Sequence, residues 1–104
     1  MNYLNNKIID TFFKDNQMRY SQETIRGYQI SLNQFFSFHQ KEYDEVKSKD
    51  VRGWLASLEE LKLKPKSIFT KLAAVKAFYH YCMEENLLKK NPTLSINSPK
   101  LDDS

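Results

Sequence analysis

The sequence is poor in the residues that specify turns, crosslinks and phosphate-binding loops. Its 104 residues include only 2 Gly, 3 Pro and 1 Cys. So few turn residues disfavour an all-β fold, and neither a Gly-rich dinucleotide loop nor a P-loop motif is present. The single cysteine, Cys82, excludes an intramolecular disulfide and fits a reducing compartment; its aromatic neighbours indicate a buried thiol.

Long apolar segments are absent as well. No run approaches the roughly 18 apolar residues of a membrane span, and the N-terminus has no apolar stretch typical of a secretory signal. We therefore expect a cytoplasmic protein with no membrane partner.

Side chains that could build a catalytic or metal site are scarce. His39 and His80 lie in neither a HxxxH nor a HExxH context, and one cysteine cannot supply the Cys and His pairs of a zinc site. The adjacent glutamates at 59–60 and 84–85 face different sides of a helix, which makes them poor acid–base pairs. The sequence therefore predicts no catalytic residue, no metal ligand, no cofactor and no small-molecule ligand.

Four segments carry the apolar periodicity of amphipathic helices, and together they predict an all-α domain built as a compact four-helix bundle. We expect helices over about 4–18, from the cap Ser21 to 39, from the cap Ser48 to 61, and from Pro65 at the first helical position to about 86. The expected core side chains are Leu4, Ile8, Ile9, Phe12, Phe13, Ile25, Tyr28, Leu32, Phe35, Phe36, Val51, Trp54, Leu55, Leu58, Leu61, Ile68, Leu72, Val75, Tyr79 and Cys82, with Phe78 at the margin.

Positive charge is concentrated in one stretch of the chain. Residues 61–90 hold seven lysines against Glu84 and Glu85, a balance of +5, so that the rest of the chain carries −2 of the overall +3. This asymmetry indicates a basic face and an anionic partner. A chance cluster of solvated lysines would give the same pattern.

The start of the fourth expected helix combines several phosphate-binding features. A helix N-terminus offers free backbone N–H groups and the positive end of the helix dipole. Lysines add long-range attraction to phosphate, and hydroxyls add directional hydrogen bonds. The candidate binding residues here are Lys62, Lys64, Lys66, Ser67, Thr70 and Lys71. A capped helix start with solvated lysines is the simpler alternative.

The side of this helix away from the expected core carries small residues. Ala73, Ala74 and Ala77 lie there with Tyr81, and they favour a close neighbour, either another helix or a nucleic-acid backbone.

The second expected helix has polar residues off its apolar stripe. Thr24 and Arg26 could reach phosphates or bases, and Gly27 would let a backbone approach. A glycine inside a helix costs about 1 kcal/mol relative to alanine. An ordinary polar helix face would explain the same residues.

Taken in order, these motifs resemble the N-terminal core-binding domain of tyrosine recombinases, the phage-integrase family. A Ser-x-x-Thr-x-x-x-Tyr-x-x-x-Leu helix begins at Ser21, and a Val-x-x-x-Asp segment begins at Val46. A long helix entered through Ser67 follows, with repeated aromatic residues near its end, and then the Asn-Pro pair 91–92. The resemblance covers about residues 3–101.

The resemblance implies a SAM-like four-helix domain that binds double-stranded DNA. In this family the domain forms one half of a clamp around the recombination site, and a separate catalytic domain supplies the Arg, His-x-x-Arg and Tyr residues. Carried over by position, the family's DNA contacts fall on Thr24, Arg26, Lys66, Ser67, Thr70 and Lys71.

The sequence departs from the complete family pattern in its catalytic residues. Its arginines are Arg19, Arg26 and Arg52, and neither histidine is followed by x-x-Arg. We therefore expect a chain that is not an enzyme. Residues 1–95 would form the core-binding domain, and 96–104 would begin a linker to an absent catalytic domain.

The expected function is non-catalytic DNA binding, in which the second and fourth helices grip the duplex at a recombination site. The expected partners are double-stranded DNA, the catalytic domain of the parent recombinase, and other recombinase protomers that pack on the first helix. The alternative is a helical protein-interaction module without DNA binding, which would dock a partner through Ile8, Ile9, Phe12 and Phe13.

Overall fold

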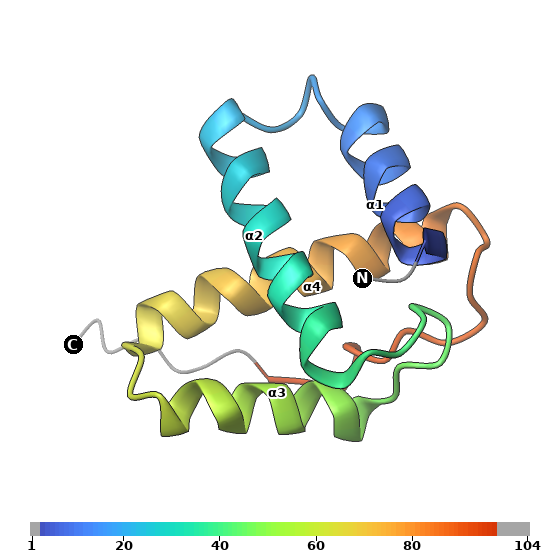
Figure 1. The fold of residues 1–104 in the computed structure, drawn as a ribbon. Helices are drawn as coiled ribbons and strands as arrows, with labels where there is room; N and C mark the ends of the chain where they lie inside the picture. Colours follow the sequence, from blue (N-terminus) through green and yellow to red (C-terminus); the bar gives the residue numbers. More distant parts are fainter. Residues whose placement is uncertain (1–2, 98–104) are drawn as a thin grey trace.

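The computed structural model describes residues 3–97 and contains four helices joined by short connections (Figure 1). The helices are α1 (Tyr3–Asp15), α2 (Gln22–His39), α3 (Ser48–Glu60) and α4 (Pro65–Glu84). α3 and α4 run antiparallel, α2 crosses α4, and α1 lies beside the C-terminal part of α4 (Figure 1). The described residues contain no strand, and the prediction of an all-α four-helix domain is confirmed.

The sequence predicted the first residues of three helices, and the structure agrees with two of these predictions. The backbone N–H of Thr24 donates to the Ser21 hydroxyl at 3.1 Å, so Ser21 caps α2 as predicted. Pro65 opens α4 at its first turn, also as predicted. Ser48 does not cap α3: the cap is Lys47, whose backbone N–H donates to the Asp50 carboxylate at 2.9 Å.

The Ser48 hydroxyl has another role. It donates to the Pro92 carbonyl at 2.9 Å, which ties the first residue of α3 to the segment that follows α4. This long-range bond replaces the local cap that the sequence indicated.

Three helices end earlier than predicted, and α4 is one of them, since it ends at Glu84 and not at about residue 86. α1 ends at Asp15, and the Phe12 carbonyl in its last turn accepts from both the Asn16 backbone N–H at 3.2 Å and the Asn16 side-chain amide at 2.8 Å. α3 ends at Glu60, so Leu61 leaves the apolar stripe and is 71% exposed. The assignment of Leu61 to the core is therefore wrong.

α4 is the central helix of the domain, and its predicted stripe is buried together with Phe78. Ala74 and Tyr81, which the sequence placed on the side away from the core, are 0% and 8% exposed. The Tyr81 ring packs against Phe12 of α1 with centroids 5.3 Å apart. Neighbouring helices thus cover more of α4 than a single stripe predicts.

The apolar face of α1 is used inside the domain. Ile9, Phe12 and Phe13 are buried in the core cluster, and Ile8 is half-buried against it. This face is not available to a partner, which removes the feature on which the protein-interaction alternative was based.

The segment after α4 also belongs to the folded unit. Thr93 is buried, and Ile96 is 6% exposed and joins the core cluster. Ile96, the first residue of the predicted linker, thus packs on the core, and residues 98–104 of that linker lie outside the described residues.

Within residues 3–97, no helix combines the length and the hydropathy needed to cross a lipid bilayer. The same part of the chain holds no group of three His, Cys, Asp or Glu side chains that could bind a metal ion.

Asn5 joins α1 to the connector between α2 and α3. Its side-chain amide donates to the Lys41 carbonyl at 2.8 Å, and its side-chain oxygen accepts from the Tyr43 backbone N–H at 2.7 Å. Asn5 is 1% exposed, so water cannot replace these bonds.

We predict that Asn5→Ala lowers the free energy of unfolding by about 3 kcal/mol, because it leaves buried backbone groups without partners. Asn6→Ala, at an exposed position of the same helix, is the matched control and should change stability little. Urea denaturation followed by circular dichroism measures both, and equal stability of the two variants would contradict this role of Asn5.

His39 is half-buried at the end of α2. Its ring lies 4.5 Å from the Phe35 ring and 5.9 Å from the Phe36 ring, between centroids, and the buried Nε2 has no hydrogen-bond partner among the described residues. Burial lowers the pKa of His39 below 6.5; the Asp50 charge opposes this shift and the Lys41 charge adds to it.

Because the unfolded chain takes up this proton more readily, the stability owed to neutral His39 is complete above pH 6.5 and falls as the pH drops below it. The Lys41 backbone N–H donates to Nδ1 of His39 at 3.4 Å. His39→Asn keeps an acceptor for this N–H and cannot titrate. We predict that the variant loses part of the decline in urea midpoint that the wild type shows between pH 7.5 and 5. An unchanged decline in His39→Asn would refute the assignment.

Candidate nucleic-acid interface

Two adjacent shallow grooves follow the seam between the N-terminal halves of α2 and α4. Gly27 and Thr70 line both grooves, so the two form one continuous surface, here called the α2–α4 seam. Its lining residues are Glu23, Thr24, Gly27, Tyr28, Ile30 and Ser31 from α2, and Lys66, Ser67, Phe69, Thr70, Lys71 and Ala73 from α4.

The structure brings together five of the eight predicted binding residues. Those that line the seam are Thr24, Lys66, Ser67, Thr70 and Lys71. Arg26 is exposed on α2 but is not part of the lining. Lys62 and Lys64 are exposed in the turn before α4, where Lys62 has a left-handed backbone φ of 62° and Lys64 is the cap residue.

No negative group among the described residues neutralises the positive end of the helix dipole at the start of α4. Lys64 supplies no side-chain cap, and the first turn holds no acidic residue. No ion pair within the described residues involves Lys64 or Lys66. This helix end therefore presents backbone N–H groups, a dipole and lysine charges to solvent in one place, an arrangement that suits phosphate.

The hydroxyl groups of the seam differ in whether they already form hydrogen bonds within the protein. The Thr70 hydroxyl donates to the Lys66 carbonyl at 3.0 Å, one turn back on α4. The Ser21 hydroxyl lies 3.0 Å from the Thr24 hydroxyl and holds it at the first turn of α2. Ser67 is exposed, and no hydrogen bond of its side chain occurs within the described residues. Ser67 is thus the readiest donor to an incoming acceptor.

Lys71 bridges the two helices of the seam. Its ammonium donates to the Gln34 side-chain oxygen at 2.6 Å, and Lys71 itself is half-buried. Its charge is therefore fixed at the side of the seam rather than free to follow a ligand. The sequence did not identify Gln34, because nothing local to α2 reveals a contact with α4.

Gly27 leaves open space in the seam. A Cβ built at this position would have no atom within 4 Å beyond its own helix, and the backbone φ is not positive. Neither packing nor backbone conformation therefore requires glycine here. The space above the α2 backbone is free for a ligand.

Two apolar side chains of the seam escaped the sequence-based prediction. Ile30 is 50% exposed and Phe69 is 37% exposed, and each lies off the core stripe of its helix. An apolar residue on an otherwise polar helix face was the signal that could have identified them. Such side chains suit contact with thymine methyl groups in the major groove.

One acidic group, Glu23, also lines the seam. It lies in the first turn of α2, where a carboxylate stabilises the helix dipole. The lining nevertheless keeps an excess of positive charge, since Lys66 and Lys71 face it from α4.

Several known proteins similar to this chain are tyrosine recombinases. It is 34% identical over 90 residues to tyrosine recombinase XerC of Bacillus licheniformis, covering 83% of this chain and 30% of that protein. XerC of Leptospira interrogans is 33% identical over 89 residues, with 82% and 29% covered. A tyrosine recombinase of Agathobacter rectalis is 35% identical over 77 residues, with 73% and 25% covered.

The chain thus spans less than a third of the length of these relatives. No solved structure matches it. Residues 9–86 match the family described as phage integrase, N-terminal SAM-like domain. That match includes α2, α3, α4 and most of α1, and the chain belongs to this family.

Proposed function

We propose that this chain is the DNA-binding domain of a site-specific tyrosine recombinase and that it grips duplex DNA through the α2–α4 seam. One observation carries the proposal: two lysines of α4 and hydroxyls of both helices line one open groove, in which no atom lies within 4 Å of a Cβ built at Gly27. Membership in the integrase family supports the same reading.

The residues divide into two roles. Four exposed cations neutralise backbone phosphates: Lys66, which lines the seam, Arg26 on α2, and Lys62 and Lys64 in the turn before α4. Lys71 adds fixed positive charge. Because phosphate contacts carry no sequence information, they set the affinity and register of the domain on the duplex.

Discrimination between sequences would come from the middle of the seam. Thr24, Thr70 and Ser67 can bond to base edges or to phosphates, and Phe69 offers an apolar contact. These groups are few, so we expect binding that tolerates many sequences.

The domain would act together with a catalytic domain and with neighbouring protomers of the parent recombinase. The chain alone would bind DNA without cutting it, because neither histidine is followed by x-x-Arg.

We predict that Lys66→Glu/Lys71→Glu weakens duplex binding more than tenfold at 0.1 M salt. Both charges line the seam, and each lost phosphate contact removes counterion release. Fluorescence anisotropy with a labelled duplex measures the affinity. Roughly four or five phosphate contacts in and beside the seam contribute about −4 to the slope of log K against log[salt], and we expect a wild-type Kd of about 10⁻⁴–10⁻⁶ M.

The matched control is Lys7→Glu/Lys49→Glu, which makes the same charge change at exposed positions of α1 and α3 that line neither groove of the seam. The control should bind with an affinity within a few-fold of wild type. No wild-type binding at low salt, or equal losses in both double variants, would refute the proposal. Thermal unfolding confirms that each variant is folded.

We predict opposite effects of Gly27→Ala on stability and on binding. The added methyl meets no atom, so stability rises by up to about 1 kcal/mol. The same methyl group occupies the space above Gly27 in which the proposed DNA would lie, so duplex affinity falls several-fold.

Gly53→Ala on α3 is the control for this substitution, because its Cβ also meets open space. It should gain similar stability and keep wild-type affinity. If Gly27→Ala binds duplex as tightly as Gly53→Ala, DNA does not approach the floor of the seam.

A further inference from the structure

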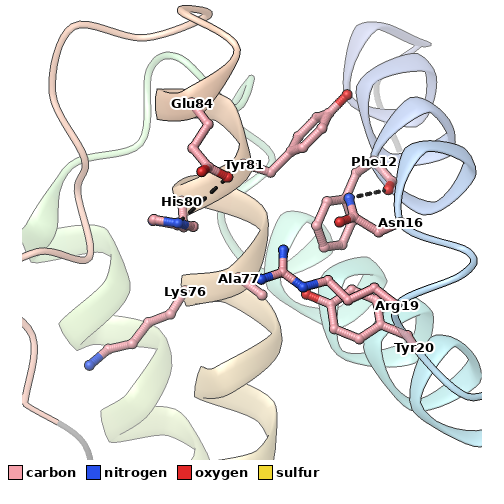
Figure 2. A pocket seen from close by; sticks show the side chains of 9 residues that line it. All are labelled: Phe12, Asn16, Arg19, Tyr20, Lys76, Ala77, His80, Tyr81 and Glu84. Carbon is pink, nitrogen blue, oxygen red and sulfur yellow. Dashed lines mark hydrogen bonds and ion pairs between the residues drawn. The ribbon is translucent and has the colours of Figure 1, made fainter.

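A second cationic groove lies farther along α4, where the turn between α1 and α2 approaches it. Its charged lining residues are Arg19 from the turn, and Lys76, His80 and Glu84 from α4. Figure 2 shows Arg19 reaching over Ala77, with Lys76 leaving α4 on the other side. None of these residues was among the predicted binding residues.

This groove continues the α2–α4 seam. Ala73 lines the seam and Ala77, one turn later on α4, lines the second groove. Tyr28 belongs to the first and Tyr20 to the second, and their rings pack with centroids 5.3 Å apart. Small side chains thus form a floor that runs under both grooves.

The charges of the second groove favour an anion. Arg19 is exposed, and no ion pair joins it to an acidic side chain within the described residues. Glu84 lies 3.6 Å from His80, a contact that is an ion pair only when His80 is protonated. Asp15 accepts a hydrogen bond from the Tyr81 hydroxyl. With His80 neutral, the groove lining carries two positive charges, on Arg19 and Lys76, against the one negative charge of Glu84.

The spacing along α4 suits the two backbones of a duplex. Lys66 and Lys76 are separated by about 15 Å of helix axis at a rise of 1.5 Å per residue. The major groove of B-DNA is about 12 Å wide between its two phosphate backbones. A helix placed across this groove can therefore meet one backbone at each end, with neutral residues such as Thr70 and Ala73 facing the bases.

We propose that Arg19 and Lys76 form a second phosphate-binding site of this domain, across the major groove from the start of α4. The inference rests on the proposed function, because it assumes that the seam faces duplex DNA. It adds two cationic contacts that neither the sequence nor the family match assigns. With these two contacts, the predicted slope of log K against log[salt] for the wild type is about −6, which is steeper than the seam contacts alone would give.

The test is Arg19→Gln/Lys76→Gln in anisotropy titrations of a labelled duplex at several salt concentrations. Losing two phosphate contacts should make the slope shallower by about 1.8 and weaken binding more than tenfold at 0.1 M salt. The matched control is Arg52→Gln/Lys49→Gln, at exposed positions of α3 that line none of these grooves. It should keep the wild-type slope.

The outcomes separate the two proposals. If the wild type binds duplex and Lys66→Glu/Lys71→Glu weakens it, but Arg19→Gln/Lys76→Gln matches its control, the second site is wrong and the seam stands. If the wild type does not bind duplex at low salt, both fail. Should the double variant unfold, Arg19→Gln alone must make the slope shallower by about 0.9, and an unchanged slope overturns the site.

Discussion

The packing of α2 against α4 is the constraint on which the rest of the structure depends. Leu32 and Phe35 of α2 and Leu72 and Tyr79 of α4 are fully buried in the same core cluster. Burial of each such side chain contributes about 1.5–3 kcal/mol. Burial also raises the pKa of Tyr79, whose hydroxyl donates to the Tyr43 carbonyl at 2.8 Å and fixes the connector to α3. The crossing therefore sets the positions of both helices and of the chain that joins α2 to the next helix.

The same crossing creates the candidate site. Because α2 and α4 meet through their apolar sides, their remaining faces diverge at the start of α4 and leave the seam between them. Thr24 and Lys66 thus come from helices fixed by the core and not from flexible loops, so little backbone conformational entropy is lost when a ligand binds. Stability and binding depend on different sides of α4, which is why charge changes in the seam should leave the fold intact.

The sequence predicted the helices and most of the core because apolar periodicity is a local signal. It failed where burial depends on a distant part of the chain. Ala74 and Tyr81 lie off the main stripe of α4 but are covered by neighbouring helices, Ser48 bonds to Pro92 instead of its own helix, and Ile96 packs back on the core. A helical wheel contains none of these contacts.

The candidate site was partly predictable for the same reason. The phosphate-binding features of a helix start depend on residues adjacent in sequence, so Lys66 and Ser67 could be identified from the sequence. The bond from Lys71 to Gln34 and the approach of Arg19 to α4 exist only after folding.

Backbone amide NMR of the ¹⁵N-labelled chain, titrated with a short duplex, tests the central claim most directly. The account predicts that the largest saturable shift changes fall on Thr24, Gly27, Ser67 and Thr70. Changes centred on α3, or none that saturate, would contradict it.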